Sequence, residues 1–291
     1  MLAKFVAHHL YDPEARARDP AHGMPAAVEA DLRARGLLRS AGRPALATVR
    51  RRLASLARLH RLLGLPSPTE DPGFRAVLAP VARTARGPRR RKSALAIDLA
   101  LLRRLLAACP PTPAGERDRA LLWTAWASGG RRRSELAALT VEQLERVPDG
   151  WRLRLGRTKT SEADDDTTVP LLGEGAQALS RWLALAGICR GGVFRGVDRW
   201  GGIADRPLSP KAVNDIVKAA AARAGIDPAR VSAHGLRAGF YTEAQRCGIP
   251  LPDAMRMTRA RDIRTAAAYY TPGEALANPA ARMAEGPGEG S

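Results

Sequence analysis

The hydrophobic period of this chain changes between about residues 140 and 172, and this change constrains the fold more than any other feature. Residues 151–155 alternate apolar and charged side chains, as a strand with one buried face does. Residues 167–171 form a second β-prone run, and the polar segment 156–166 separates the two runs. Elsewhere the apolar residues recur at helical spacing. We therefore predict a mainly α fold with a small antiparallel β-hairpin sheet.

Interruptions of the helical pattern predict two domains, which suits a length of 291 residues. Residues 87–94 begin with Gly-Pro and continue with basic residues, as a linker does. We predict a helical domain over residues 1–86, a basic linker over 87–94 and a second domain over 95–277. Residues 278–291 are rich in Ala, Gly, Pro and Glu, and we expect a mobile tail there.

Apolar periodicity places the expected helices on both sides of the hairpin. Val28, Leu32 and Leu37 form a stripe in the first of them, and Thr48 is a candidate cap of the second. Residues 191–202 are Gly-rich, and we expect a loop there. The expected helices cover residues 25–35, 48–63, 71–84, 98–108 and 115–128, one begins at Ser134, and more follow from Gly173.

The chain is strongly basic, with a formal net charge of +18 and a pI of about 11.2. Such an excess costs self-repulsion and indicates a polyanionic partner. The helix expected over 48–63 carries five arginines on one face and no acid, which favours contact with a phosphate backbone, although a solvated surface is the alternative. The residues predicted to bind DNA in this part of the chain are Arg50, Arg51, Arg58, Arg89, Arg90, Arg91 and Lys92.

Other classes of protein are disfavoured by the cysteines and by the hydropathy. Cys109, Cys189 and Cys247 are odd in number and form no CxxC pair, so we expect neither a disulfide framework nor a metal site. No apolar run approaches the roughly 18 residues of a membrane span. The N-terminus lacks a clear secretion signal. We expect a cytoplasmic protein with no membrane association.

Three separated motifs combine residues that can hold and attack a phosphate. His234 and Arg237, in the run 234–240, share one helical face. Arg132 lies in the run 130–136 at the start of an expected helix, where an anion can bind, although surface charge is the alternative. Lys159 lies in the hairpin loop, and lysine can give up a proton as arginine cannot. Tyr269 follows further along the chain.

These motifs resemble the catalytic domain of the tyrosine recombinase (phage integrase) family, from about residue 95 to 275. The resemblance is carried by Gly-x-Arg-x-Ser-Glu-Leu around Arg132, the Gly-Arg-Thr-Lys-Thr loop around Lys159, His-Gly-Leu-Arg at 234–237 and Tyr269, in that order. The loop around Lys159 is similar to Cre-type members. Residues 44–95 also resemble the helical core-binding domain of the family, which is SAM-like. The resemblance implies a two-domain, C-shaped clamp around duplex DNA.

The same resemblance implies a mechanism. Arg132 and Arg237 would bind the non-bridging oxygens of the scissile phosphate, and Tyr269 would attack the phosphorus to give a 3′-phosphotyrosyl bond. His234 would act as base or proton relay, and Lys159 would protonate the departing 5′-hydroxyl. Glu135 would orient Arg132, and Arg157 would contact DNA. Neither ATP nor a metal cofactor would be needed. Tyr270 is the alternative nucleophile, disfavoured by family spacing.

One position departs from the family pattern. Where the family commonly has Thr-Gly-His, with histidine or tryptophan in the last place, this chain has Thr258-Arg259-Ala260. Alanine cannot donate a hydrogen bond to the phosphate, and losing one transition-state donor typically costs about 10²–10³ in rate. The chain could be a slower enzyme, use a neighbouring donor such as Arg259 or Arg261, or have become a DNA-binding protein.

The resemblance implies site-specific DNA recombination or integration by an enzyme that works as a homotetramer on double-stranded DNA with inverted-repeat sites. It would be associated with the nucleoid. Two alternatives stay open at this stage. The first is DNA relaxation of the type IB topoisomerase kind, which shares the chemistry without pairing two sites. The second is the recombinase-derived DNA-binding protein with weakened catalysis.

Overall fold

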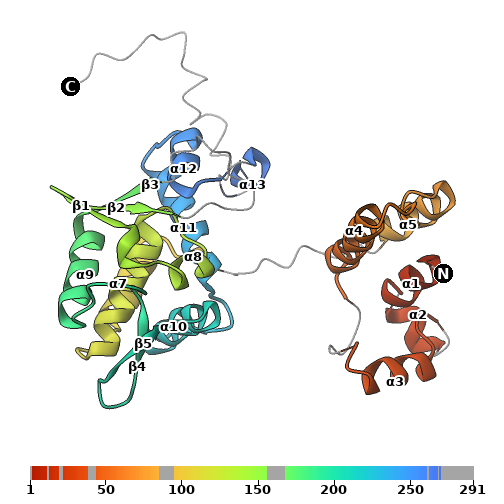
Figure 1. Ribbon diagram of the computed structural model, residues 1–291, viewed down its shortest axis with the longest axis horizontal. Coiled ribbons are helices and arrows are strands. Elements are labelled where there is room, and N and C mark those ends of the chain that lie inside the picture. The colour runs from red at the N-terminus through yellow and green to blue at the C-terminus, as the bar shows by residue number, and fades with distance from the viewer. Residues whose placement is uncertain are drawn as a thin grey trace, which may run out of the picture. The chain divides into compact units, whose positions relative to one another are not determined.

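The computed structural model of the protein describes residues 2–11, 13–19, 22–38, 44–84, 95–155, 168–260, 262–267 and 269. The chain divides into two compact units, residues 1–90 and 91–291, which are described separately (Figure 1). The predicted linker, 87–94, and tail, 278–291, lie outside the described residues. The assignment of the first unit as a core-binding domain stays a prediction, as does the clamp.

The first unit is helical throughout its described part, with a small core. Val6, Val49, Leu53 and Phe74 are among its buried residues, contributed by three different helices. Asp71 Oδ1 accepts a hydrogen bond of 2.7 Å from Phe74 N and so caps the last helix. The helices are α1 (Leu2–His9), α2 (Pro13–Arg18), α3 (Ala26–Ala34), α4 (Leu46–Leu62) and α5 (Pro72–Thr84).

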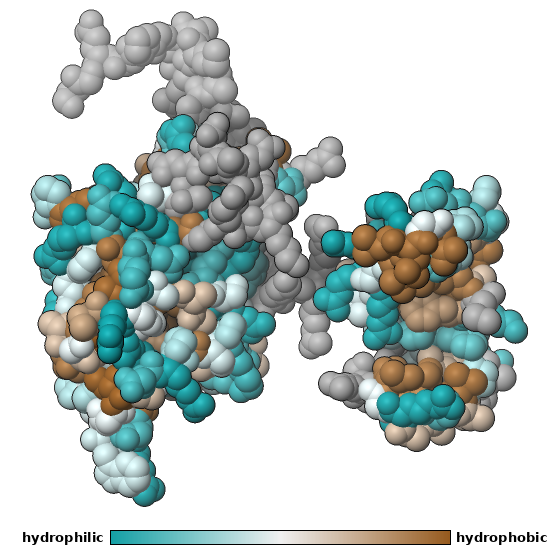
Figure 2. Space-filling view, in the orientation of Figure 1, coloured by the Kyte–Doolittle hydropathy of each residue, from teal (hydrophilic) through white to brown (hydrophobic). Residues whose placement is uncertain are grey.

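Two sequence-based expectations for this unit are wrong in detail. Helix α4 begins at Leu46 with Ala45 as its N-cap, so Thr48 lies inside the helix and does not cap it. Helix α3 has no buried residue, so the expected stripe does not form a core face. A unit this small cannot cover all of its apolar residues, and Figure 2 shows several on its visible surface. The strongly exposed leucines include Leu37, Leu59, Leu62 and Leu63.

The second unit confirms the mainly α fold class and its small antiparallel sheet. Strand β2 pairs with β3 antiparallel, as the hairpin predicts, and β1 adds a third strand on the other side of β2. The Gly-rich loop expected over 191–202 is in part a second hairpin, β4–β5. The elements are α6 (Leu99–Ala107), α7 (Pro113–Ala127), α8 (Arg133–Ala137), η1 (Val141–Gln143), β1 (Leu144–Val147), β2 (Gly150–Arg154), β3 (Thr168–Leu172), α9 (Gly173–Leu185), β4 (Arg195–Val197), β5 (Ile203–Pro207), α10 (Pro210–Arg223), α11 (Ala233–Arg246), α12 (Leu251–Thr258) and α13 (Ile263–Ala267).

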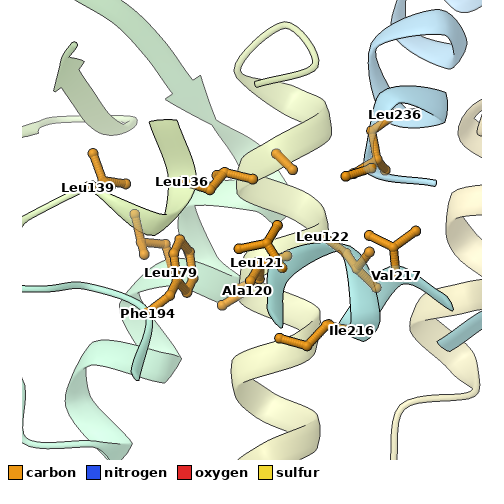
Figure 3. Packing of buried hydrophobic residues seen from close by; sticks show 14 of the residues in the cluster. Ala120, Leu121, Leu122, Leu136, Leu139, Leu179, Phe194, Ile216, Val217 and Leu236 are labelled. Atoms are coloured by element: carbon orange, nitrogen blue, oxygen red, sulfur yellow. The ribbon is translucent and has the colours of Figure 1, made fainter. Parts of the chain in front are cut away.

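Helix α7 is the centre of this unit. It contacts α6, α9, α10, α11 and both sheets, so it is buried on most sides and lacks a single apolar stripe. Figure 3 shows Leu121 and Leu122 of α7 among Leu136, Leu179, Ile216 and Val217, which come from α8, α9 and α10. The C-terminal end of α7 leads directly into the run that contains Arg132.

Capping residues explain where several helices of this unit begin. Asp98 Oδ1 accepts from Leu101 N at 2.9 Å, and Thr112 Oγ1 accepts from Gly115 N at 3.2 Å. Ser209 Oγ accepts from Ala212 N at 3.1 Å, and Pro210 follows as the first helical residue of α10. Within the described ranges, no helix is long and apolar enough to cross a bilayer.

Candidate active site

Helix α11 presents His234 and Arg237 in its first turns, on one face. Asn214 of α10 fixes the start of this helix, because its Oδ1 accepts a hydrogen bond of 3.0 Å from Ala233 N. Arg237 is half-buried and donates from Nη2 to Thr258 O at 2.8 Å and from Nη1 to Gly130 O at 3.5 Å. These bonds fix the guanidinium between the start of α8 and the end of α12. Burial lowers the pKa of Arg237 below its ordinary value.

Arg132 is the N-cap residue of α8, and Glu135 holds it there. Glu135 Oε2 accepts from Arg132 N at 3.1 Å, and Glu135 Oε1 accepts from Arg132 Nη1 at 2.9 Å. The Arg132 side chain is 59% exposed, so it can reach a ligand in front of the site. Helix α8 has only five residues, so its dipole contributes little. The positive charge here therefore comes from the side chains. These contacts support an orienting role for Glu135, which stays a prediction.

Two glycines allow the Arg132 run to approach α11 and α12 closely. Gly129 and Gly130 have φ values of +93° and +67°, which glycine adopts without steric cost. A Cβ on Gly130 would lie 2.2 Å from Arg237 Cα, and one on Gly129 would lie 2.4 Å from Met257 O. The spacing between Arg132 and Arg237 thus depends on the absence of a side chain at 130.

We expect Gly130→Ala to destabilise the second unit by at least about 2 kcal/mol, because it combines a left-handed backbone with a clash against the α11 backbone. Urea unfolding measures the loss. The matched control is Gly225→Ala, since Gly225 has a similar φ of +71° and open space around it. The control should lose only about 1 kcal/mol. Equal losses of unfolding free energy in the two variants would show that the close contact between residue 130 and the α11 backbone contributes nothing to stability.

Arg131 is a site residue that sequence analysis missed. Its side chain is only 2% exposed, its Nη2 donates to Met257 O at 2.5 Å, and its Nη1 lies 3.8 Å from Glu135 Oε2. Burial lowers the pKa of Arg131 to about 10, with Glu135 opposing that shift, so the side chain stays charged at neutral pH. Three consecutive arginines look alike in the sequence, and no signal there distinguishes the buried one.

Tyr269 lies beside the α11 residues. Its Oη is 2.8 Å from His234 Nε2, within hydrogen-bond distance. Burial raises the pKa of the Tyr269 phenol, Arg237 opposes the rise, and Tyr241 adds to it. A phenol with a raised pKa needs a base to lose its proton near neutral pH. His234 Nε2 is placed to accept that proton when the imidazole is neutral.

A cleft of about 600 Å³ opens in front of these arginines. Arg132, His234 and Arg237 line it together with Arg131, Arg133 and Lys218, so the cleft has a strong positive charge. Figure 2 shows that the visible face of this unit is mostly hydrophilic. The structure therefore brings together Arg132, His234, Arg237 and Tyr269. The other predicted site residues lie outside the described residues: Lys159, Arg157, Tyr270, Arg261, Arg89, Arg90, Arg91 and Lys92.

The end of α12 contains the position that departs from the family pattern. Ala260 is half-buried and packs in a small cluster with Tyr241 and Tyr269. Arg259, at the usual glycine position, caps α12 in the left-handed conformation, with φ of +52° and ψ of +42°. A non-glycine residue there costs about 1–2 kcal/mol. In the described part of the chain no acidic side chain pairs with Arg259, and its charge acts on Arg131.

We expect Arg259→Gly to stabilise the second unit by about 0.5–1 kcal/mol, because glycine relieves the left-handed strain but loses more backbone entropy on folding. Urea unfolding at pH 7 measures the change. Arg256→Gly, three residues earlier inside α12, should instead destabilise by about 1 kcal/mol. A loss of stability in Arg259→Gly would mean that the arginine makes interactions worth more than its strain.

In the part of the chain that the structure describes, no cluster of three or more His, Cys, Asp or Glu side chains could hold a metal ion.

The candidate DNA-binding residues of the first unit, Arg50, Arg51 and Arg58, are exposed on α4. Among the described residues, no acidic side chain forms an ion pair with them. Their role in DNA binding stays a prediction.

Comparison with known proteins decides the family. The sequence matches the Phage integrase family over residues 97–275. The chain belongs to the phage integrase family. It is 30% identical over 236 residues to an integrase/recombinase XerD homolog of Selenomonas ruminantium, covering 78% of this chain and 68% of that protein. It is 34% identical over 172 residues to the tyrosine recombinase XerD of Xanthomonas axonopodis pv. citri, covering 55% of this chain and 52% of that one.

Solved structures of recombinases share the fold of this phage integrase family member. The Tn1549 transposon integrase in complex with circular intermediate DNA superposes with a TM-score of 0.55 at 14% identity, covering 87% of this chain and 81% of that one. The XerH recombinase bound to its difH substrate before cleavage gives a TM-score of 0.53 at 15% identity, covering 81% and 71%. The predicted membership of the tyrosine recombinase family is confirmed. The chain spans about half the length of the Xanthomonas relative.

Proposed function

We propose that this tyrosine recombinase catalyses site-specific DNA strand exchange through a 3′-phosphotyrosyl intermediate. The observation that carries the proposal is the hydrogen bond between Tyr269 Oη and His234 Nε2, beside Arg237 and the arginine-lined cleft. It joins a nucleophile, a base and anion-binding groups in one chain. The net charge of +18 supports a polyanionic substrate. The relatives named as recombinases support the same reaction.

The first chemical step follows from these positions. The Tyr269 oxygen attacks the phosphorus of a DNA phosphodiester, and its proton passes to His234 Nε2. A P–O bond to Tyr269 forms as the bond to the 5′-oxygen breaks. Arg237 and Arg132 neutralise the charge that develops on the non-bridging oxygens. Lys159 is the proposed donor of the proton that the 5′-oxygen takes up.

The second step reverses the first with another strand. A free 5′-hydroxyl attacks the phosphorus of the phosphotyrosyl link and gives its proton to Lys159, while the P–O bond to Tyr269 breaks. The Tyr269 oxygen takes back its proton from His234 Nε2. The bond energy is conserved, so the residues of the chain suffice without a nucleotide or metal cofactor. Exchange of strands between two duplexes requires several protomers. We propose that a homotetramer assembles on inverted-repeat sites of double-stranded DNA in the nucleoid.

The domain assignment is part of the same proposal. The first unit would bind DNA as the helical core-binding domain, through Arg50, Arg51 and Arg58 of α4, and the second would carry out the chemistry. Further phosphate contacts would come from Arg157, which lies between β2 and β3 in the sequence, and from the basic linker with Arg89, Arg90, Arg91 and Lys92. The charge of these residues supports the proposal, since each neutralised phosphate adds to affinity and to its salt dependence.

A covalent adduct tests the proposal. The DNA is a nicked duplex built on a site selected by binding from a random library, so that cleavage releases a short fragment and cannot be reversed. We expect a protein–DNA adduct that survives denaturation by SDS. Tight binding without an adduct would favour the recombinase-derived DNA-binding protein, and in that case Ala260→His tests whether a restored donor brings cleavage back. Relaxation of supercoiled DNA by monomers would favour the topoisomerase-like reaction.

A further inference from the structure

A row of aromatic rings runs from the core of the second unit to Tyr269. The sequence holds only five Trp, four Tyr and four Phe, yet two Trp, two Tyr and one Phe stand in this row. Trp123–Trp126, Trp126–Phe240 and Phe240–Tyr241 have ring centroids 6.5, 5.8 and 6.3 Å apart and cross at 81°, 71° and 72°. The last pair differs, because Tyr241 and Tyr269 stack at 5.2 Å with an interplanar angle of 3°.

Tyr241 is held in place by burial and by a contact of its hydroxyl group, in addition to its stack on Tyr269. It is fully buried on α11 and belongs to a cluster formed by α11, α12 and α13. Its Oη lies 2.5 Å from Thr258 Oγ1, and Thr258 Oγ1 also donates to Met255 O at 3.2 Å. The hydroxyl contact fixes the outer end of the ring, and the close packing around the buried ring fixes its plane. Tyr241 therefore offers Tyr269 a flat surface of fixed orientation.

Thr258 connects this surface to the phosphate-binding residue. Its hydroxyl bonds Tyr241, and its carbonyl accepts the hydrogen bond from Arg237 Nη2 at 2.8 Å. One residue at the end of α12 thus contacts both the Tyr241 hydroxyl and the Arg237 guanidinium. Tyr269, through its stack on Tyr241, is thereby linked to Arg237 by the contacts of Thr258.

The Tyr269 ring is confined from two directions. Tyr241 covers its face, and His234 lies at its hydroxyl end with ring centroids 6.0 Å apart at 59°. Ala260, which packs in the same cluster, contributes no ring of its own. Sliding within its plane is the motion that the stack leaves to the Tyr269 ring, because parallel rings resist tilting. The hydrogen bond to His234 Nε2 limits this motion at the hydroxyl end of the ring.

We propose that Tyr241 is a positioning residue that orients Tyr269 for attack on the phosphate. The inference rests on the proposed function, since it assigns the nucleophile to Tyr269. Tyr241 itself touches no reacting atom. Tyr241 contributes by fixing the direction from which the Tyr269 oxygen approaches phosphorus. Small displacements of a reacting group can cost about 10²-fold in rate.

The test compares Tyr241→Phe and Tyr241→Leu in the full chain. Phenylalanine keeps the ring and loses the Thr258 bond, whereas leucine keeps apolar volume and loses the flat face. The probe is a duplex with a bridging 5′-phosphorothiolate, whose sulfur leaves without a proton from Lys159, so the rate reports on Tyr269. We expect Tyr241→Leu to lower the single-turnover cleavage rate by about 10- to 100-fold with DNA affinity within about twofold. Tyr241→Phe should stay close to wild type.

Phe240→Leu is the matched control, because Phe240 contacts Tyr241 and Trp126 in the row, and no ring contact joins it to Tyr269 in the described residues. A residue that acts only in packing would affect stability in Phe240→Leu and Tyr241→Leu alike and leave both cleavage rate constants unchanged. An unchanged rate constant in Tyr241→Leu would therefore overturn the proposal.

A second readout does not depend on cleavage. In protein with ¹³C-labelled tyrosine rings, the Tyr269 signals, assigned by their loss in Tyr269→Phe, should be shifted upfield by the Tyr241 ring. We expect Tyr241→Leu to abolish this shift and Tyr241→Phe to keep it. If wild-type protein forms no adduct, the proposed function fails, and this shift alone decides whether Tyr241 holds Tyr269. A Tyr269 signal that is the same in Tyr241→Leu and wild type would overturn the proposal.

Discussion

Tyr269→Phe should abolish the SDS-resistant DNA adduct completely, because phenylalanine has no oxygen with which to attack phosphorus. The ring remains, so the stack on Tyr241 and the fold should persist, and DNA affinity should stay within about twofold of wild type. The measurement is adduct formation on the nicked duplex by SDS gel electrophoresis, together with binding by gel shift. This is the largest effect that we expect from any single substitution.

Tyr270→Phe is the matched control for that experiment, since it removes a hydroxyl from the neighbouring residue. We expect this variant to form the adduct at nearly the wild-type rate. The reverse outcome, an adduct in Tyr269→Phe and none in Tyr270→Phe, would move the nucleophile by one residue. Such a result would also contradict the proposed transfer of the Tyr269 proton to His234 through their hydrogen bond.

Arg237→Gln should lower the cleavage rate by about 10³-fold or more. Removing one transition-state donor commonly costs about 10²–10³, and Arg237 also supplies a full charge from a half-buried position. The loss of its bonds to Thr258 O and Gly130 O should loosen the site further. Single-turnover cleavage measures the rate, and urea unfolding reports how far the fold is weakened.

Arg246→Gln provides the comparison for Arg237→Gln. Arg246 lies at the other end of the same helix, is 58% exposed and pairs with Asp98 at 2.9 Å. Its loss changes the charge of the protein equally and should change the cleavage rate by no more than about twofold, since exposed ion pairs contribute about 0–1 kcal/mol. Equal losses in the two variants would indicate that the net charge of the chain, and not the position of Arg237, limits cleavage.

The elements that sequence reasoning predicted well are those with strong local determinants. The helices expected from residues 71 and 98 do form, and the structure shows Asp71 and Asp98 as their caps. The alternation over 151–155 forms a strand paired in the predicted hairpin. The β4–β5 hairpin was missed because its strands are short and lie in a Gly-rich segment. The start of α4 was misplaced because a threonine with good capping chemistry lies one turn inside the helix.

The candidate site also contains residues that the sequence predicts and residues that it does not. His234 and Arg237 could be placed on one face from their spacing alone, because helical geometry is local. The burial of Arg131 and the stacking of Tyr241 on Tyr269 depend on how α8, α11 and α12 meet, and no local pattern encodes that. Resemblance to a family did not help with either residue, because it concerns the motifs and not the packing behind them.

The bond between Tyr269 and His234 joins two residues of one chain, and this has a consequence for the proposed homotetramer. A subunit in this state carries its own tyrosine next to its own base and its own Arg237. Two defective subunits, one without the tyrosine and one without the arginine, would then be unable to complement each other, because neither could lend the missing group. Control over which strands are cut would then act on the position of Tyr269 within each subunit. A subunit would be inactivated by displacement of its own tyrosine, and not by the absence of a tyrosine from a neighbouring subunit.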